Sequence, residues 1–115
     1  MGNIKTENFG VDQRRFKRCT LEMLVGVTRE GQFGFEYSVQ VSEGGMLLGV
    51  FSPFQVGELL EISFFMPPTG DLISVRGEVV YCTEPDSGKY FAGVRFLEAS
   101  GTTVQTIRSF VNAEI

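Results

Sequence analysis

The feature that most restricts the fold is an unbroken alternation of apolar and polar side chains across residues 33–42. The apolar members of this series are Phe33, Phe35, Tyr37, Val39 and Val41. A period of two is typical of a β-strand, because successive side chains point to opposite faces. The pattern therefore predicts a strand with one wholly apolar face. The polar face ends in Gln40 and Ser42, which are two residues apart and so point the same way.

Further short strand-like segments recur along the chain, most of them alternating and one, residues 46–51, nearly continuously apolar, separated by turn signals rich in Gly and Pro. Six strands at this spacing predict an all-β fold, a closed or nearly closed six-stranded antiparallel barrel, because closure removes the exposed edges of a small sheet. A bulge or bend is expected at Gly77, and residues 84–89 are expected to form a hairpin loop. The predicted strands cover 21–27, 33–42, 46–51, 58–66, 72–82 and 90–97.

The apolar period changes to that of a helix near the C-terminus. Val104, Ile107, Phe110 and Val111 recur at helical spacing, and Ser100 or Thr102 could cap the first turn. One amphipathic C-terminal α-helix is therefore predicted, placed to plug one end of the barrel.

Length and composition favour a single globular domain. The chain has 115 residues, of which 43% are hydrophobic, enough for one core but too few for two domains. Residues 1–13 are polar and aperiodic and are expected to form a flexible N-terminal arm, followed by one domain at 14–115. No segment has the length of a membrane helix or the apolar core of a signal peptide, so a cytoplasmic protein without membrane insertion is expected.

The residue types argue against common enzyme chemistry. The sequence has no histidine, which excludes the usual zinc sites and the Ser-His and Cys-His nucleophiles, so no metal is expected. Cys19 and Cys82 are too few for a disulfide framework and are interpreted as small core residues. The carboxylates Glu36, Glu43 and Glu78 show no acid–base pairing. We therefore expect a protein that is not an enzyme.

Charge is divided unevenly along the chain. Residues 1–18 contain five cations and two acidic residues, a net +3, whereas residues 19–115 contain five cations and twelve acidic residues, a net −7. An acidic body repels a long phosphate backbone, which needs cations spread over a face, so no nucleic-acid polymer is expected as a partner. A small anion that contacts only the basic segment is compatible with this distribution.

Two short stretches could form an anion site. Arg14 and Arg18 are four residues apart and share a face in a helical or an extended segment, so their guanidinium groups could close on one ligand. Ser42 could donate its hydroxyl, and the glycines after it let backbone N–H groups approach an anion. Each stretch also has a simpler interpretation, the first as a solvated basic tail and the second as an ordinary turn.

The chain resembles PilZ domains, bacterial six-stranded barrels that bind cyclic di-GMP. The family signature is Arg-x-x-x-Arg in an N-terminal segment, matched here by residues 14–18, and (Asp or Asn)-x-Ser-x-x-Gly, matched by residues 40–45 except that Gln40 replaces Asp or Asn. The resemblance implies a nucleotide receptor with no cofactor. The site residues that it implies are Arg14, Arg15, Arg18, Gln40, Ser42 and Gly45, with a weaker indication for Tyr81.

The resemblance also implies a signalling mechanism. The N-terminal arm would close over cyclic di-GMP and alter a surface presented to an unknown downstream protein, in a monomer or weak dimer. Gln40 leaves an alternative open, because it lacks the charge of Asp and is one methylene longer than Asn. In this alternative the chain is a degenerate PilZ-like adaptor that does not bind the nucleotide and acts through protein–protein contacts.

Overall fold

The computed structural model describes residues 16–113. The predicted arm (1–13) and two predicted ligand residues, Arg14 and Arg15, lie outside the described residues. The elements are β2 (Cys19–Thr20), β3 (Leu24–Arg29), β4 (Gln32–Val41), β5 (Gly45–Val50), β6 (Leu59–Met66), β7 (Asp71–Asp86), β8 (Lys89–Leu97) and α1 (Gly101–Ala113).

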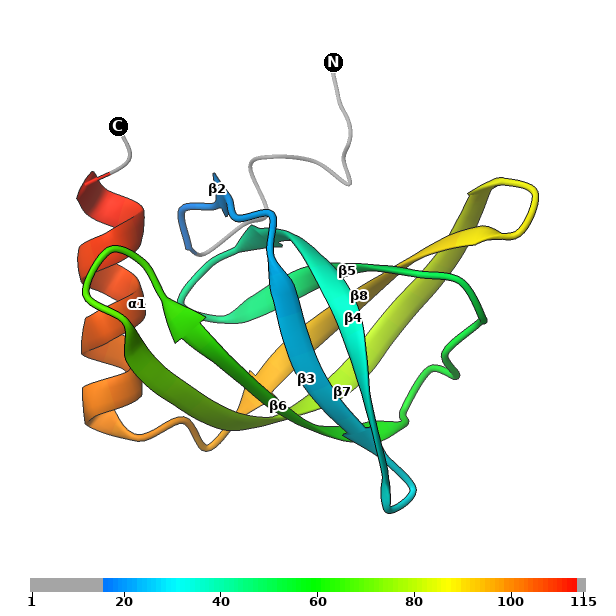
Figure 1. The fold of residues 1–115 in the computed structure, drawn as a ribbon, viewed down its shortest axis with the longest axis horizontal. Helices are drawn as coiled ribbons and strands as arrows, with labels where there is room; N and C mark the ends of the chain where they lie inside the picture. Colours follow the sequence, from blue (N-terminus) through cyan, green and yellow to red (C-terminus); the bar gives the residue numbers. More distant parts are fainter. Residues whose placement is uncertain (1–15, 114–115) are drawn as a thin grey trace.

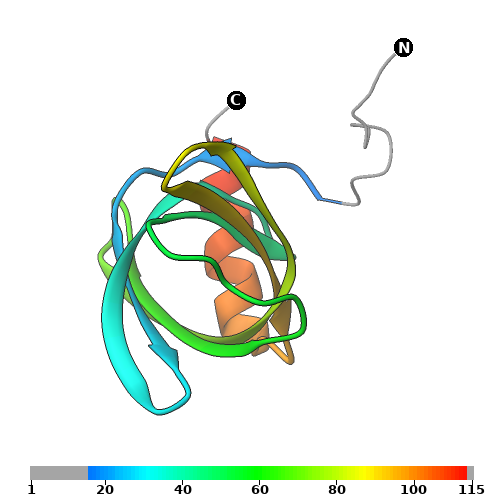
Figure 2. The ribbon, with the colours of Figure 1, turned by 90° about the vertical axis from the view of Figure 1, so that its right-hand side faces the viewer.

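Six antiparallel strands close into a barrel. The order is β4-β3-β6-β7-β8-β5, and β5 pairs again with β4. Each of these six strands therefore has a hydrogen-bonded neighbour on both sides. The two-residue β2 adds a short pairing to β4. Figure 1 shows the strands crossing one another around the barrel, with α1 standing at one side next to β6. Figure 2 shows α1 behind the ring of strands, where it covers one end. The predicted six-stranded antiparallel barrel with a C-terminal helix is confirmed.

The core fills the interior of the barrel with side chains from all six barrel strands. Burying each large aliphatic group contributes about 1.5–3 kcal/mol relative to leaving it in water. The largest fully buried side chains are Leu48, Leu60, Ile62, Met66, Ile107, Val25, Val41, Val79 and Val111. Two of these nine belong to α1, so the helix is part of the core and closes it at one end.

The start of α1 agrees with the sequence prediction. The backbone N–H of Thr103 donates to the Ser100 hydroxyl at 3.1 Å, which is the geometry of an N-cap. Ile107 and Val111 are buried one turn apart, which confirms the predicted amphipathic face. No helix within residues 16–113 combines the length and apolar character needed to cross a membrane.

The single apolar face predicted for residues 33–41 is wrong. Phe33, Phe35 and Tyr37 are 62%, 64% and 54% exposed, whereas Val41 is buried. The reason is a β-bulge between Ser38 and Gln40, which adds one residue and exchanges the two faces of the strand. Odd-numbered residues therefore point outward before the bulge and inward after it.

The bulge also puts a polar side chain in the core. Ser38 is 2% exposed, and its hydroxyl donates to the carbonyl oxygen of Leu21. The same hydroxyl accepts from the backbone N–H of Met23 at 3.2 Å. These bonds satisfy the buried hydroxyl and hold the segment before β3 against β4. They also explain why regular pairing with β4 starts at Leu24 and not at the predicted residue 21.

Two predictions about β7 need correction. Gly77 is not a bulge, because it pairs in register with Phe96, and the irregularities lie further along, between Val79 and Tyr81 and between Thr83 and Asp86. A Cβ atom at Gly77 would lie 2.5 Å from Val94 Cγ1, so close packing inside the barrel explains this glycine. The hairpin loop predicted at 84–89 is shorter, because β7 runs to Asp86 and β8 begins at Lys89.

The two cysteines are at the margin of the core. Cys19 and Cys82 are half-buried and pack against the buried cluster. Their interpretation as small core residues is therefore only partly right, because neither is enclosed.

An ion pair ties the loop before β6 to the end of β3. Arg29 donates to both carboxylate oxygens of Glu58, at 2.8 Å from Nε and 3.1 Å from Nη2, and its guanidinium lies 3.9 Å from the ring centroid of Phe54. The backbone N–H of Gln55 also donates to this carboxylate at 3.1 Å. The hydrogen bond from Arg29 is the main cause that lowers the pKa of Glu58.

We predict that Glu58→Gln lowers the free energy of unfolding at pH 7 by about 1–2 kcal/mol, because a charged acceptor is lost. The pKa of Glu58 is lowered by folding, so its charge stabilises the protein above the ordinary value of 4.5. That stabilisation is lost as the pH falls through the lower folded value. Urea unfolding at pH 7 and pH 3 should show the difference between wild type and variant shrinking at pH 3. An equal difference at both pH values would contradict this account.

Candidate functional site

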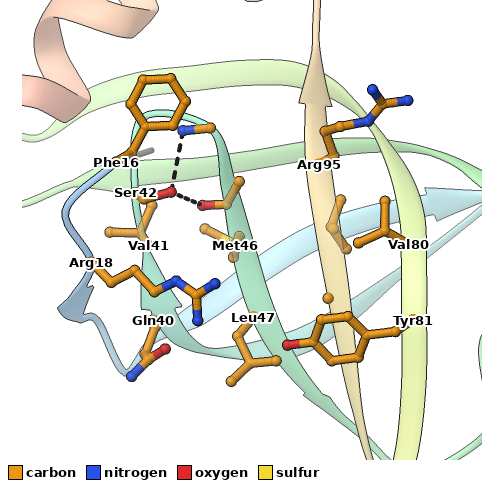
Figure 3. A pocket seen from close by; sticks show the side chains of 14 residues that line it. Phe16, Arg18, Gln40, Val41, Ser42, Met46, Leu47, Val80, Tyr81 and Arg95 are labelled. Carbon is orange, nitrogen blue, oxygen red and sulfur yellow. Dashed lines mark hydrogen bonds between the residues drawn. The ribbon is translucent and has the colours of Figure 1, made fainter. Parts of the chain in front are cut away.

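A hollow of about 350 Å³ lies on the outer surface of the barrel, where the segment entering β2 meets the β4–β5 turn and strands β7 and β8. Figure 3 shows its side chains, with Arg18 extending across it from one side and Tyr81 from the other. Of the predicted site residues, Arg18, Gln40, Ser42 and Gly45 line the hollow. Its lining residues are Phe16, Arg18, Gln40, Val41, Ser42, Gly44, Gly45, Met46, Leu47, Val80, Tyr81, Gly93, Val94 and Arg95.

The β4–β5 turn is held by Ser42. Its backbone N–H donates to the carbonyl oxygen of Gly45 at 2.9 Å, and its hydroxyl accepts from the N–H of Gly44 at 3.2 Å. The second bond is drawn in Figure 3. Ser42 thus fixes the shape of the turn, and its side chain lies at the wall of the hollow. The hydroxyl also donates to the carbonyl oxygen of Gly45 at 3.5 Å, so both of its hydrogen bonds lie within the turn.

The two glycines of this turn allow other parts of the protein to pack closely against it. A Cβ atom at Gly45 would lie 2.1 Å from the carbonyl oxygen of Val94, a backbone atom that cannot move aside. A Cβ atom at Gly44 would lie 2.7 Å from the ring of Phe16. Gly45 is therefore required where β5 meets β8, whatever its contact with a ligand. Its predicted approach to a ligand stays a prediction.

Phe16 joins the basic stretch to the turn. Its ring lies on the backbone of Gly44, which places the segment at residues 16–18 beside the β4–β5 turn. The sequence patterns point to the cations of this stretch and not to Phe16. The signal available was an aromatic residue inside an otherwise basic cluster, followed downstream by a glycine pair.

One register row crosses four strands and forms the floor of the hollow. Gln40 on β4 pairs with Leu47 on β5, Leu47 pairs with Gly93 on β8, and Gly93 pairs with Tyr81 on β7. A Cβ atom at Gly93 would lie 2.2 Å from the ring of Tyr81, so the ring lies over this glycine. The irregularity after Val79 brings Tyr81 into the row. The floor therefore has an amide at one end and a partly exposed aromatic ring at the other.

Cations and ion pairs surround this floor. Arg18 and Arg95 line the hollow from opposite sides (Figure 3), and Arg95 forms an ion pair with Glu78. Glu43 in the turn accepts two bonds from Arg108 on α1, both at 3.0 Å, and this bond raises the pKa of Arg108. The turn is thus linked to the C-terminal helix as well as to the segment before β2.

The residue types suit an anion that carries a flat group. Guanidinium forks bind phosphate oxygens in pairs, and aromatic faces offer a stacking surface for a base. Within residues 16–113, no group of three or more potential metal ligands from His, Cys, Asp and Glu is present.

Comparison with solved structures supports the same architecture. The barrel is similar to the Bacillus subtilis inhibitor of motility MotI/DgrA, with a TM-score of 0.78 and 20% identity over 89% of this chain. It is also similar to the PilZ domain of Escherichia coli YcgR solved with c-di-GMP, with a TM-score of 0.71 and 17% identity over 88% of this chain. A third similar structure is Borreliella burgdorferi PlzA in complex with c-di-GMP, with a TM-score of 0.64 and 16% identity over 91% of this chain.

The lengths of these proteins differ. The chain covers 90% of the YcgR domain but only 50% of MotI/DgrA and 43% of PlzA. No curated protein matches the chain. The family model of the PilZ domain matches residues 12–113, nearly the whole sequence, and the chain therefore belongs to the PilZ domain family.

Proposed function

We propose that this domain is a bacterial receptor for cyclic di-GMP and that Arg14, Arg15, Arg18, Gln40, Ser42 and Gly45 form its binding site, within a domain spanning residues 14–115. The observation that carries the proposal is the meeting of two stretches in one hollow: Arg18 from the first, and Gln40, Ser42 and Gly45 from the second. Membership of the PilZ family and the likeness to two structures solved with c-di-GMP support it.

The chemistry of the ligand matches the lining of the hollow. Cyclic di-GMP presents two phosphate groups and two guanine bases. Arg18 can donate two parallel hydrogen bonds to a phosphate or to a guanine edge, and its flat face can stack on a base. Gln40 supplies an amide, and the exposed part of the Tyr81 ring supplies an apolar face.

Binding would act through the connections of the β4–β5 turn. In the proposed mechanism, the residues before Phe16 close over the nucleotide, and the turn with its Phe16–Gly44 contact becomes the base of the closed site. The Glu43–Arg108 ion pair links this turn to α1, which offers a route from ligand to surface. The altered surface would be read by a downstream protein partner, and the protein would work in the cytoplasm as a monomer or weak dimer.

The family match indicates a receptor domain and not an enzyme family. The ligand would therefore leave the site unchanged. No chemistry beyond binding is assigned to the hollow.

We predict that Arg14→Ala or Arg18→Ala weakens cyclic di-GMP binding about ten- to a hundredfold, because each change removes charged hydrogen bonds of about 1.5–3 kcal/mol. Isothermal titration calorimetry measures the dissociation constant. Arg76→Ala is the matched control, since Arg76 is an exposed arginine outside the hollow. No heat from the wild type at high micromolar nucleotide would refute the receptor proposal.

The second candidate function is an adaptor that has lost the nucleotide. Gln40 favours the adaptor, because the family prefers Asp or Asn at this position. Gln lacks the negative charge of Asp and is one methylene longer than Asn. The exposed side chains of Phe33, Phe35 and Tyr37 also favour contacts with another protein, since large apolar groups gathered on a surface often mark an interface.

Gln40→Asp separates the two candidates. If the protein is a receptor, this variant should bind cyclic di-GMP a few-fold tighter than the wild type, because a carboxylate can hold an arginine in place and accept from guanine N–H groups. Gln40→Leu keeps the size without the polar group and serves as the control. Binding by Gln40→Asp together with a silent wild type would support the adaptor.

A further inference from the structure

Arg95 lies at the wall of the hollow, although it belongs to neither signature motif. It is on β8, directly opposite Gly45 on one side and Glu78 on the other. Its side chain is 60% exposed, so the guanidinium can reach a bound molecule. With Arg18 on the far side, the hollow has an arginine at each edge.

In the structure, Arg95 is turned away from the hollow. Figure 3 shows its guanidinium on the side away from Ser42, towards β7. There its Nη2 atom donates to Oε1 of Glu78, the residue opposite it on β7. The side chain of Glu78 is 29% exposed and that of Arg95 is 60% exposed. An exposed pair of this kind shifts an equilibrium by about fivefold at most, so a doubly charged ligand can compete with it.

We propose that Arg95 is a further anion-binding residue of this site and that Glu78 is an internal competitor that holds it away until a phosphate is bound. The proposal rests on the proposed function for the identity of the nucleotide, but its core is a contact between Arg95 and a phosphate group. Binding then exchanges the Glu78 carboxylate for a phosphate. The competition between Glu78 and the phosphate for Arg95 lowers the affinity of the site. Both residues lie outside the two signature motifs.

A second arginine–glutamate pair provides a matched control. Arg76 and Glu98 lie 3.5 Å apart, and their side chains are 55% and 84% exposed. Neither lines the hollow. Neutralising Glu98 therefore makes the same change in net charge as neutralising Glu78, without releasing an arginine at the site.

The test measures cyclic di-GMP binding by calorimetry for the wild type, Glu78→Gln, Arg95→Gln, the double variant, Glu98→Gln and Arg76→Gln. Glu78→Gln should bind about three- to fivefold tighter, and Arg95→Gln about tenfold weaker. The double variant should lose the gain, because Glu78 acts only through Arg95. Glu98→Gln and Arg76→Gln should match the wild type. Thermal unfolding of each variant checks that it is folded.

A second ligand separates this proposal from the receptor proposal. The same variants are titrated with inorganic pyrophosphate and followed by NMR chemical shifts, which detect weak binding to the phosphate contacts alone. If the nucleotide binds but Glu78→Gln and Arg95→Gln match their controls, the role of Arg95 is refuted and the receptor remains. If the nucleotide fails to bind but pyrophosphate binding depends on Arg95 and Glu78, the receptor proposal fails and the anion site remains. If the affinity for neither ligand changes when the two residues are replaced, the inference is overturned.

Discussion

The pairing of β5 with both β4 and β8 is the constraint on which the rest of the structure depends. It closes the sheet into a barrel, and it requires Gly45, because any side chain there would collide with the carbonyl oxygen of Val94. The same closure brings the β4–β5 turn alongside Arg95 and Tyr81. The barrel and the hollow are therefore built by one set of contacts, and a change that opens the barrel at β5 would also dismantle the site.

The positions of the six barrel strands were predictable, because most of them alternate with a period of two, residues 46–51 form a nearly continuous apolar run, and Gly and Pro mark the turns between them. The helix was predictable from the helical spacing of its apolar residues, and of the two possible caps, Ser100 and Thr102, the structure uses Ser100. The bulge at Val39 was not predictable. An inserted residue leaves the alternation in the sequence intact while exchanging the faces of the strand in space. Phe33, Phe35 and Tyr37 therefore read as core residues but lie at the surface.

The site was predictable only in part. Arg18, Gln40, Ser42 and Gly45 follow from two short patterns in the sequence, and all four line the hollow. Arg95 and Glu78 could not be found in this way, because their positions depend on strand register between residues far apart in the chain. Phe16 stands out in the sequence as the aromatic residue of a basic stretch, but its contact with Gly44 appears only in the fold. Arg95 meets Gly45 and Glu78 only because β8 lies between β5 and β7. Sequence patterns reveal residues that lie in the same short segment. Strand order and register decide which residues of distant strands lie next to that segment.

The proposed receptor function requires that cyclic di-GMP occupies the hollow where the two stretches meet. The most direct test is a two-dimensional amide NMR spectrum of the labelled protein, recorded with increasing nucleotide. The account predicts saturable shifts for the amides around the hollow, including Arg18, Gly44 and Gly93, and little change at Phe33 and Phe35 on the far part of β4. Saturable shifts confined to the β3–β4 hairpin, or no saturable shifts at all, would contradict it.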